Sequence, residues 1–335
     1  MNSHTDQVEL TPAQIDFCAK HITGFAMDSW RISLAGKAGS DRVFLRLSPV
    51  PDCGRSYVLV LWNSRDSDWE RFIRIQEEVS RSIQLLPAIY AVDAAHGLIL
   101  EEDCGRRRLK DFCLATHDRG EVEAMYRRVC DALVTWQQIP PAQCPVLSSR
   151  VLDKDMFLWE TDYFSTHCVG EYFGLDALLN GEWERERHTL AEEAAALPLV
   201  CLHRDFQSEN IMIHTDGIKF VDYQGARQGA AGYDVASLLF DPYVSCLDEK
   251  LRYRLLDYYI QRSGRNVSRY SFHIAAIQRL AQALGAYGNL SLHKGKDVYR
   301  AYIPVALSLL LQVLEQEHIF PRFTTIVSEC RQRTY

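Results

Sequence analysis

The hydrophobic and polar positions of this 335-residue chain follow one pattern in its first hundred residues and another afterwards. In the first part, short apolar runs of strand length are separated by glycine-containing turns. These runs predict β-strands at residues 31–34, 42–47, 57–61, 88–92 and 97–101. One amphipathic helix is expected at 68–83, because apolar residues from Phe72 to Ile83 recur there at helical spacing. A shorter helix is expected to begin at Pro12, with Thr11 and Gln14 forming a capping box.

From Leu109 onward the periodicity is mainly helical, with one interruption. Two short alternating runs, 210–213 and 218–221, flank the turn sequence Thr-Asp-Gly, and an Asp-Gly turn between such runs predicts a β-hairpin. The expected fold class is therefore α+β, with two lobes. Residues 1–103 form a small β-rich lobe, and residues 104–335 form a larger, mainly helical lobe that contains the hairpin.

Composition removes several classes of function. The chain has 37 Lys and Arg against 44 Asp and Glu, a net charge of −7, so neither nucleic acid nor an anionic membrane is an expected partner. The ten cysteines form no C-x-x-C pair, which disfavours a zinc knuckle and a disulfide framework. The start of the chain is polar, which argues against a signal peptide. The apolar run 303–311 is shorter than the ~20 residues that span a bilayer, which argues against a transmembrane helix there. We therefore expect a cytoplasmic protein without an obligate protein partner.

The polar residues around the hairpin are the strongest candidates for chemistry. His203, Asp205 and Asn210 form an H-x-D-x-x-x-x-N arrangement, and Asp222 closes the second run 12 residues after Asn210. Phosphoryl transfer needs a carboxylate beside the attacking hydroxyl and hard oxygen ligands for magnesium. The structural alternative is a polar loop followed by an acid at a strand end. The hairpin between the two groups favours the catalytic interpretation.

This segment resembles the catalytic loop of the protein-kinase-like fold, and the chain is similar to the aminoglycoside phosphotransferase and choline kinase family. Within it, several stretches resemble the bacterial anomeric N-acetylmuramate/N-acetylglucosamine kinases. These stretches are residues 39–46, 98–103, 157–164, 221–239 and 277–285. The resemblance covers about residues 30–315. It implies a bilobal kinase-like fold with the active site between the lobes, ATP and Mg²⁺ as cofactors, and a small-molecule acceptor.

The resemblance also implies a role for each matching residue. Asp205 would accept or orient the proton of a sugar hydroxyl, while Asn210 and Asp222 would bind magnesium. His203 would hold the loop, and Asp234 would brace it from the following helix. An acid favoured by the helix macrodipole is an equally good interpretation of Asp234.

The nucleotide-binding candidates lie in the N-terminal lobe. They are Gly39, Ser40, Arg42, Arg46, Glu101, Glu102 and Asp103. The acidic residues would offer backbone groups to adenine, although an acidic strand end is an equally good alternative. The expected third strand has no Lys to hold the phosphates. Arg42 or Arg46, which share one strand face, or the backbone of the turn at 36–40 could replace it, and an exposed strand face is the alternative for both arginines.

The acceptor-binding candidates are Glu160, Tyr163 and Arg279. Helix packing is the alternative for the first two, and a salt bridge within the helical lobe is the alternative for Arg279. The leading hypothesis is a magnesium-requiring, ATP-dependent kinase that phosphorylates a sugar hydroxyl, with the anomeric hydroxyl of an N-acetylated amino sugar preferred. The alternatives are an aminoglycoside, choline or another alcohol as acceptor, or a catalytically silent pseudokinase, which the missing Lys and the poor glycine loop at 36–40 would favour.

Overall fold

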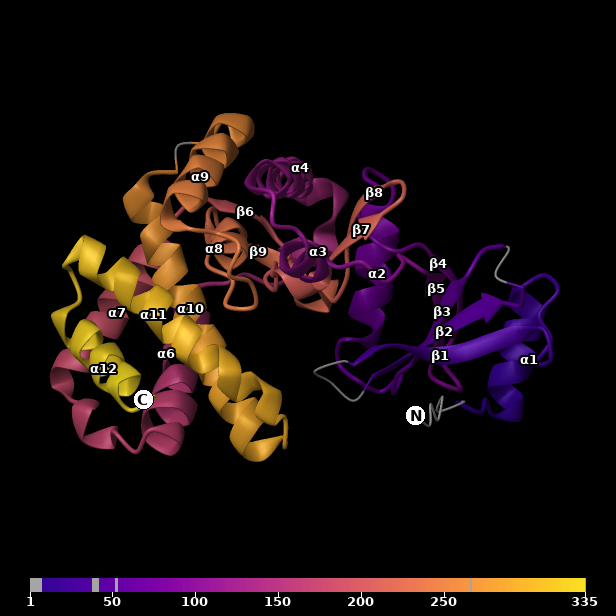
Figure 1. Ribbon diagram of the computed structural model, residues 1–335, viewed down its shortest axis with the longest axis horizontal. Coiled ribbons are helices and arrows are strands. Elements are labelled where there is room, and N and C mark those ends of the chain that lie inside the picture. The colour runs from indigo at the N-terminus through magenta and orange to yellow at the C-terminus, as the bar shows by residue number, and fades with distance from the viewer. Residues whose placement is uncertain (1–7, 38–41, 52–53, 266, 335) are drawn as a thin grey trace. The chain divides into compact units, whose positions relative to one another are not determined.

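The computed structural model describes residues 8–37, 42–51, 54–265 and 267–334 (Figure 1). The chain divides into two compact units. The first unit comprises the residues up to Arg107 together with Met212–Gln224, and the second comprises Arg108–Ile211 together with all residues from Gly225 onward. The predicted hairpin thus belongs to the first unit. Gly39 and Ser40 lie outside the described residues.

The first unit is built on an antiparallel five-stranded sheet with the strand order β1-β2-β3-β5-β4. The strands are β1 (Trp30–Lys37), β2 (Val43–Pro49), β3 (Tyr57–Leu61), β4 (Ile89–Asp93) and β5 (Leu98–Glu102). Leu59 of β3 and Leu100 of β5 are paired in register and fully buried, so the centre of the sheet forms part of the core. All five predicted strands are confirmed.

Two helices complete this unit, α1 (Pro12–His21) and α2 (Trp69–Val79). The capping box of α1 is present, with the Thr11 side chain accepting from the Gln14 backbone amide and the Gln14 side chain accepting in return. Helix α2 ends four residues earlier than predicted. The Ser80 carbonyl accepts from the side-chain amide of Gln84 at 2.9 Å, which takes the place of a further helical backbone bond.

The hairpin consists of β7 (Ile211–His214) and β8 (Gly217–Phe220), as the Asp-Gly signal predicts. It is attached to the rest of the first unit through its backbone. The Phe220 amide donates to the Leu85 carbonyl at 2.7 Å, and the Ile213 amide donates to the Arg107 carbonyl at 2.8 Å. Asp222, a candidate site residue that follows the hairpin, therefore belongs to the first unit as well.

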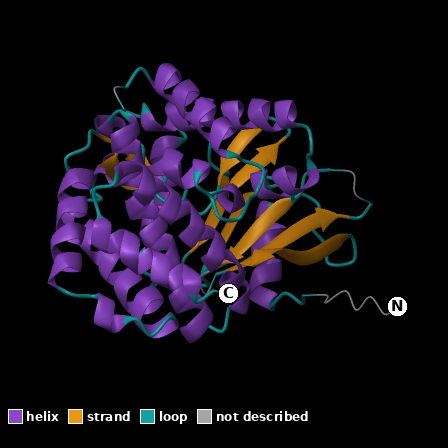
Figure 2. Ribbon diagram, turned by 60° about the vertical axis from the view of Figure 1, so that its left-hand side comes forward, coloured by secondary structure: helices purple, strands orange, loops and turns teal. Residues whose placement is uncertain are grey.

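The second unit is mainly helical (Figure 2). Its α-helices are α3 (Leu109–Ala115), α4 (Arg119–Gln137), α5 (Pro145–Ser148), α6 (Lys154–Phe164), α7 (Gly181–Ala195), α8 (Tyr233–Leu239), α9 (Glu249–Ser263), α10 (Arg269–His293), α11 (Ile303–Glu317) and α12 (Pro321–Gln332). A π-helical segment, η2 (Ser165–Tyr172), continues directly from α6. Short 3₁₀ helices cover η1 (Pro141–Gln143), η3 (Asp176–Leu178), η4 (Ser208–Asn210), η5 (Tyr223–Gly225) and η6 (Asp297–Tyr302).

Two short strands that the sequence pattern does not predict also lie in this unit. They are β6 (Leu199–Leu202) and β9 (Arg227–Ala230), which pair antiparallel. Strand β9 reads Arg-Gln-Gly-Ala, without the β-branched or aromatic residues that signal a strand. A Cβ on Gly229 would lie 2.4 Å from a methyl carbon of Leu202, so this pair depends on a residue without a side chain. Strand β6 leads directly into His203 and the candidate catalytic loop.

Helix α10 is the central helix of the second unit and packs against α6, η2, α8 and α11. Two glycines allow the backbones to approach closely. A Cβ on Gly288 would lie 2.3 Å from the carbonyl oxygen of His167, and one on Gly285 would lie 2.7 Å from the carbonyl carbon of Tyr163. Nearly the whole length of α10 is buried as a result.

Among the described residues, one helical stretch, 297–317, has the length and composition of a membrane span. Its apolar side chains at Ile303, Leu307, Leu310 and Leu314 are buried, and the α11 part of the stretch packs against α10 and α12. One face of this stretch is thus packed within the second unit, while Val298 and Val305 are exposed.

We expect Gly288→Ala to destabilise the protein by about 1–3 kcal/mol, because the new methyl group meets backbone atoms that cannot rotate away. Alanine has the better helix propensity, so any stabilisation would contradict the close approach of α10 and η2. Urea denaturation measures the change. The matched control is Gly181→Ala in α7, where a Cβ would have its nearest neighbour at 3.7 Å and the stability should not fall.

Candidate active site

The loop after β6 is held by a buried carboxylate. Asp234, in the first turn of α8, accepts hydrogen bonds from the backbone amides of His203 at 2.7 Å and Arg204 at 2.9 Å. Burial raises the pKa of Asp234 to about 7, although these two amides oppose the shift. Asp234 therefore combines both interpretations, since it lies at a helix N-terminus and also fixes the loop backbone.

A second buried carboxylate, which the sequence pattern does not reveal, holds the other end of the loop. Asp241 accepts from the backbone amide of Ser208 at 2.6 Å and from that of Tyr243 at 2.8 Å. Asp241 lies two residues after the end of α8, so the carboxylates that hold the two ends of the loop come from the first turn of one short helix and from just beyond its C-cap. The sequence signal is weak, because an acid before a proline is typical of any turn.

The Asp205 carboxylate is three-quarters buried between two guanidinium groups. Its oxygens lie 3.5 Å from Arg204 Nη1 and 3.9 Å from Arg279 Nη2. Burial acts to raise the pKa of Asp205, but the positive charges of these two arginines outweigh it and hold the pKa below its ordinary value. Asp205 is thus an ionised hydrogen-bond acceptor at neutral pH. Asn210 is tied to the same residue, since its side-chain amide donates to the Asp205 carbonyl at 3.0 Å.

Glu160 lies behind Arg204 and is completely buried. Its carboxylate accepts from the Tyr233 hydroxyl at 3.0 Å and from the Gln278 amide at 3.3 Å, and it lies 3.5 Å from Arg204 Nη2. Burial raises its pKa, while the charge of Arg204 opposes the shift. The Arg204 guanidinium consequently connects two carboxylates, that of Glu160 and that of Asp205.

The two other acceptor candidates also lie in the second unit. Arg279 is buried and donates to the hydroxyl of Ser237 and the side-chain oxygen of Gln207, both at 3.1 Å, in addition to its ion pair with Asp205. Tyr163 accepts a 2.6 Å hydrogen bond from Asn289, and its ring stacks on the exposed Trp159 ring at 5.1 Å. The structure therefore brings Arg279 to Asp205 directly.

In the first unit, Arg42 is placed beside Asp222. Its guanidinium donates to the Asp222 carboxylate and, at 3.0 Å, to the side-chain oxygen of Gln224. It also lies 4.9 Å from the ring centroid of Trp62, and it is buried, whereas the Asp222 side chain is 40% exposed. A buried positive charge thus faces a carboxylate that retains access to solvent.

The three acidic residues at the end of β5 have different environments. The Asp103 carboxylate accepts hydrogen bonds from Arg46 Nε at 2.7 Å and Arg46 Nη2 at 2.9 Å, and from the Ser56 hydroxyl at 2.7 Å. Glu102 pairs with Lys219 of β8 at 3.0 Å. Arg46 therefore belongs to a buried ion pair, and Lys219 joins the hairpin to the sheet.

Glu101 differs from both neighbours because its side chain is buried without an ion pair at hydrogen-bonding distance among the described residues. Burial raises its pKa to about 8, against the opposing charge of Arg42 and with added repulsion from Asp103 and Glu102. Its Oε2 atom has no hydrogen-bond partner in the described part of the chain. A proton on Glu101 near neutral pH follows from this environment.

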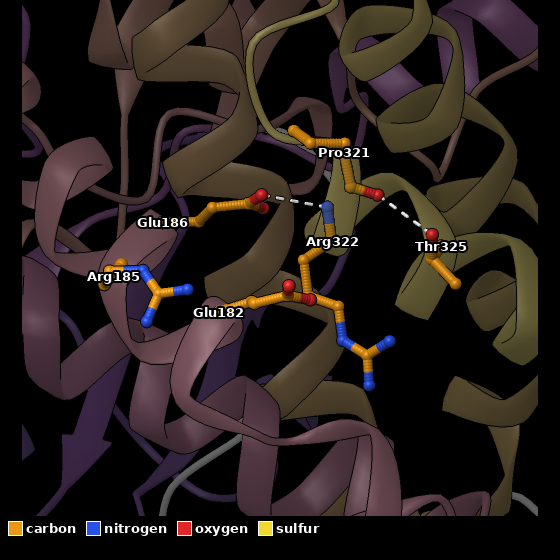
Figure 3. Close-up of a pocket in the computed structure, with 6 residues that line it drawn as sticks. All are labelled: Glu182, Arg185, Glu186, Pro321, Arg322 and Thr325. Atoms are coloured by element: carbon orange, nitrogen blue, oxygen red, sulfur yellow. Dashed lines mark hydrogen bonds between the residues drawn. The ribbon is translucent and has the colours of Figure 1, made fainter.

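Figure 3 shows a pocket elsewhere in the second unit, where α7 meets the start of α12. It is lined by Glu182, Arg185, Glu186, Pro321, Arg322 and Thr325. The Glu186 carboxylate accepts the backbone amides of Arg322 at 2.9 Å and Phe323 at 2.7 Å, so it caps the N-terminus of α12. None of the candidate site residues in the described part of the chain lines this pocket. Its acidic residue Glu186 serves to cap α12.

Comparison with known sequences identifies the family. The sequence profile of the phosphotransferase enzyme family matches residues 32–273. This chain belongs to that family. The phosphotransferase is 25% identical to an N-acetylmuramate/N-acetylglucosamine kinase of Pseudomonas putida over 320 residues, which cover 91% of each chain.

Solved structures resemble the phosphotransferase over most of its length. A choline/ethanolamine kinase family protein from Mesorhizobium loti has a TM-score of 0.61 at 16% identity, covering 96% of each chain. The aminoglycoside phosphotransferase APH(2'')-IIa, in a ternary complex with streptomycin and ATP, has a TM-score of 0.58 at 16% identity, covering 91% of this chain and 97% of that one. The expected kinase-like α+β fold and the expected enzyme class, a phosphotransferase acting on an alcohol group, are confirmed.

Glu101 gives a testable pH dependence of stability. In the folded protein its carboxyl keeps its proton up to about pH 8, whereas an unperturbed glutamate loses it near 4.5. The folded state therefore binds more protons than the unfolded state in this interval, and the free energy of unfolding falls as the pH rises through it. In Glu101→Gln, the free energy of unfolding should fall less steeply over this pH interval than in the wild type, by about a few kcal/mol in total.

Urea denaturation at several pH values between 5 and 8 measures this difference. The matched control is Glu77→Gln, on the exposed side of α2 in the same unit, which should keep the wild-type slope. Identical slopes for wild type and Glu101→Gln would show that Glu101 does not titrate in this range.

Proposed function

We propose that this phosphotransferase transfers the γ-phosphate of ATP to the anomeric hydroxyl of an N-acetylated amino sugar. The observation that supports the proposal most strongly is the state of Asp205, an ionised carboxylate on a loop whose backbone is held at both ends. The name of the Pseudomonas putida relative supports the choice of acceptor.

Asp205 is suited to orient an attacking hydroxyl. An ionised carboxylate accepts hydrogen bonds only, so the hydroxyl proton would point toward it and an oxygen lone pair toward the phosphorus atom. Arg204 and Arg279 would hold the carboxylate in place during the reaction. Phosphoryl transfer depends mainly on such positioning and on stabilisation of charge.

The donor chemistry of Asn210 and Asp222 fits magnesium, which prefers carboxylate and carbonyl oxygens. Asn210 uses its amide nitrogen to bind the Asp205 carbonyl, which leaves its side-chain oxygen for a cation. Asp222 uses Oδ1 toward Gln224, and its side chain keeps 40% of its surface exposed. Bound Mg²⁺ would neutralise phosphate charge.

Arg42 is our candidate for the phosphate-binding cation that replaces the missing third-strand Lys. Its guanidinium is already held beside Asp222, whereas the Arg46 guanidinium donates two hydrogen bonds to Asp103. The backbone of Glu101, Glu102 and Asp103 at the end of β5 remains the proposed contact for adenine. ATP as the donor is supported by the ternary complex of the related aminoglycoside phosphotransferase, and an ATP-dependent enzyme of this kind is expected in the cytoplasm.

The acceptor candidates acquire different roles. The complete burial of Glu160 favours a positioning role, in which it holds Arg204 and, through Arg204, the Asp205 carboxylate. Arg279 would likewise position Asp205. Tyr163 and the exposed Trp159 beside it offer aromatic surface on which a sugar ring could stack.

We expect Asp205→Asn to lower kcat by about 10²–10⁴-fold, because an amide cannot replace an ionised acceptor. A coupled assay for ADP formation measures the rate, and circular dichroism checks folding. The matched control, Asp216→Asn, changes an exposed acid at the tip of the hairpin and should keep the wild-type rate. Wild-type turnover by Asp205→Asn on every accepted substrate would refute the role of Asp205.

The acceptor itself is tested with a panel that contains N-acetylmuramate, N-acetylglucosamine, an aminoglycoside and choline, each with and without Mg²⁺. We expect the highest kcat/KM for the N-acetylated amino sugars and no reaction for the methyl glycoside of N-acetylglucosamine, whose anomeric oxygen is blocked. Preference for an aminoglycoside or choline would replace the proposed acceptor. No ADP with any acceptor, together with no Mg²⁺-dependent ATP binding by calorimetry, would favour a silent pseudokinase.

A further inference from the structure

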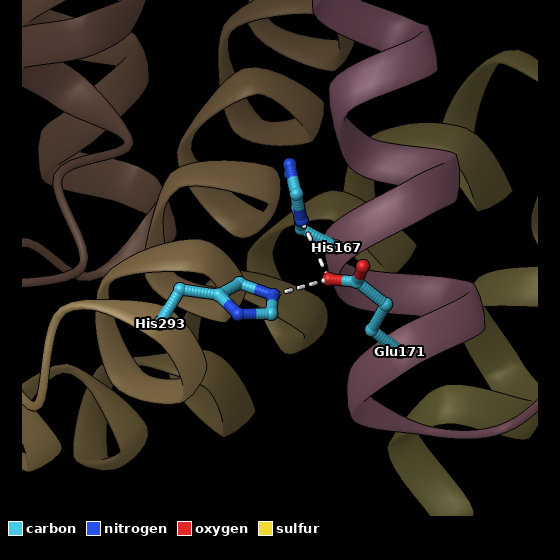
Figure 4. A group of neighbouring side chains, drawn as sticks. All are labelled: His167, Glu171 and His293. Atoms are coloured by element: carbon cyan, nitrogen blue, oxygen red, sulfur yellow. Dashed lines mark hydrogen bonds and ion pairs between the residues drawn. The ribbon is translucent and has the colours of Figure 1, made fainter.

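Two histidines and a glutamate meet at the surface of the second unit, where none of the three has a role in the proposed phosphotransfer (Figure 4). His167 and Glu171 lie on the π-helical segment η2, and His293 is the last residue of α10. The Glu171 Oε2 atom lies 2.6 Å from His167 Nδ1 and 2.8 Å from His293 Nε2. One ligand atom from each of the three side chains lies within 4.8 Å of the other two.

We propose that His167, Glu171 and His293 form a binding site for a divalent transition-metal ion, with Zn²⁺ as the preferred occupant. Two neutral imidazoles and one carboxylate provide a net charge of −1 and borderline ligands, which suit Zn²⁺. Magnesium prefers oxygen ligands, so this site differs in chemistry from the one proposed at Asn210 and Asp222. Three protein ligands also leave one position of a tetrahedral ion for water.

The exposure of the cluster allows such a water and an entry path for the ion. The Glu171 side chain is 39% exposed and that of His293 is 49% exposed, while His167 is more deeply placed at 21%. The ion would therefore bind at the surface, with its open position toward solvent.

The backbone beneath the cluster is held rigidly. Gly288 lies five residues before His293 on α10 and allows this helix to touch the carbonyl oxygen of His167. The His167 ring packs edge-on against Tyr163 at 4.6 Å, and Tyr163 is hydrogen-bonded to Asn289 of α10. One contact thus joins α10 to η2 and the other joins α10 to α6, so the backbone segments that carry the ligands are held together before any ion binds, which reduces the ordering cost of binding.

The residue spacing adds a second reason for the site. In η2 a π-helical turn replaces the α-helical one, and such segments in α-helices are frequently found at functional sites. His167 and Glu171 are four residues apart, a spacing at which two side chains share one face of a helix, and their polar atoms meet. The metal would link this segment to the end of α10 and stabilise both.

The test is a calorimetric titration of the full-length protein, without a polyhistidine tag and after treatment with a chelator, with zinc chloride. We expect one equivalent of Zn²⁺ to bind, and a rise in Tm that saturates at one equivalent. Outer-shell partners alone change metal affinity about 10–100-fold, so Glu171→Gln and His293→Gln should each weaken binding at least tenfold. No nucleotide or acceptor is present, so the result is independent of the proposed phosphotransfer.

The matched control is His96→Gln, which removes a surface histidine that pairs with a single carboxylate, Asp93, at 2.8 Å. It should leave zinc affinity unchanged. The metal-free Tm and circular dichroism of each variant establish that it is folded, and Co²⁺ absorption in the visible range gives a second readout of the ligands. Absence of zinc binding in the wild type, or wild-type affinity in His293→Gln, would overturn the proposal.

Discussion

The candidate active site depends on the two hydrogen bonds that the Asp234 carboxylate accepts from the candidate catalytic loop. Arg204 has a left-handed backbone conformation, with φ of 77°, which is unfavourable for a residue with a side chain and persists only where the surroundings hold it. Asp234 supplies that support, because a buried carboxylate without donors would be costly and the two amides satisfy it. The same conformation directs the Arg204 side chain and the adjacent Asp205 side chain.

In both units, charged side chains of the candidate site lie beside side chains of opposite charge. In the second unit, Arg204 and Arg279 flank Asp205, and Glu160 balances Arg204 from the far side. In the first unit, Arg42 faces Asp222. Each charge is thereby oriented by an opposite one, which keeps the Asp205 carboxylate ionised while most of its surface is removed from water. Removing Arg204 would leave the completely buried Glu160 without its ion-pair partner.

The parts of the fold that depend on local pattern could be predicted from the sequence, and those that depend on distant contacts could not. Alternating apolar residues and an Asp-Gly turn are local signals, and they give the five strands and the hairpin correctly. Strand β9 forms because Gly229 lets it lie against Leu202, a contact that its own four residues do not encode. Helix α2 ends at Val79, and the Gln84 side chain satisfies the carbonyl of the next residue, Ser80, a contact that apolar spacing does not report.

The same distinction applies to the site. The motif residues Asp205, Asn210 and Asp222 are recognisable from spacing and resemblance, and the roles given to them remain proposals. The burial of Glu160 could not be read from a helix segment with mixed polarity, since it arises from Tyr233 and Gln278, which are 73 and 118 residues away. Asp241 could not be predicted from the sequence, because its partners are backbone amides and no pattern of side chains indicates such contacts.

The assignment of the hairpin to the first unit has a consequence for how such proteins can be rearranged. The chain enters the second unit after Arg107, returns for Met212–Gln224 and leaves again, so neither unit is one uninterrupted piece of sequence. A fragment that ends at Arg107 would lack Phe220 and Lys219, the hairpin partners of Leu85 and Glu102. A recombinant exchange of the first unit of this protein must therefore transplant two segments together, which ties Asp222 to the sheet.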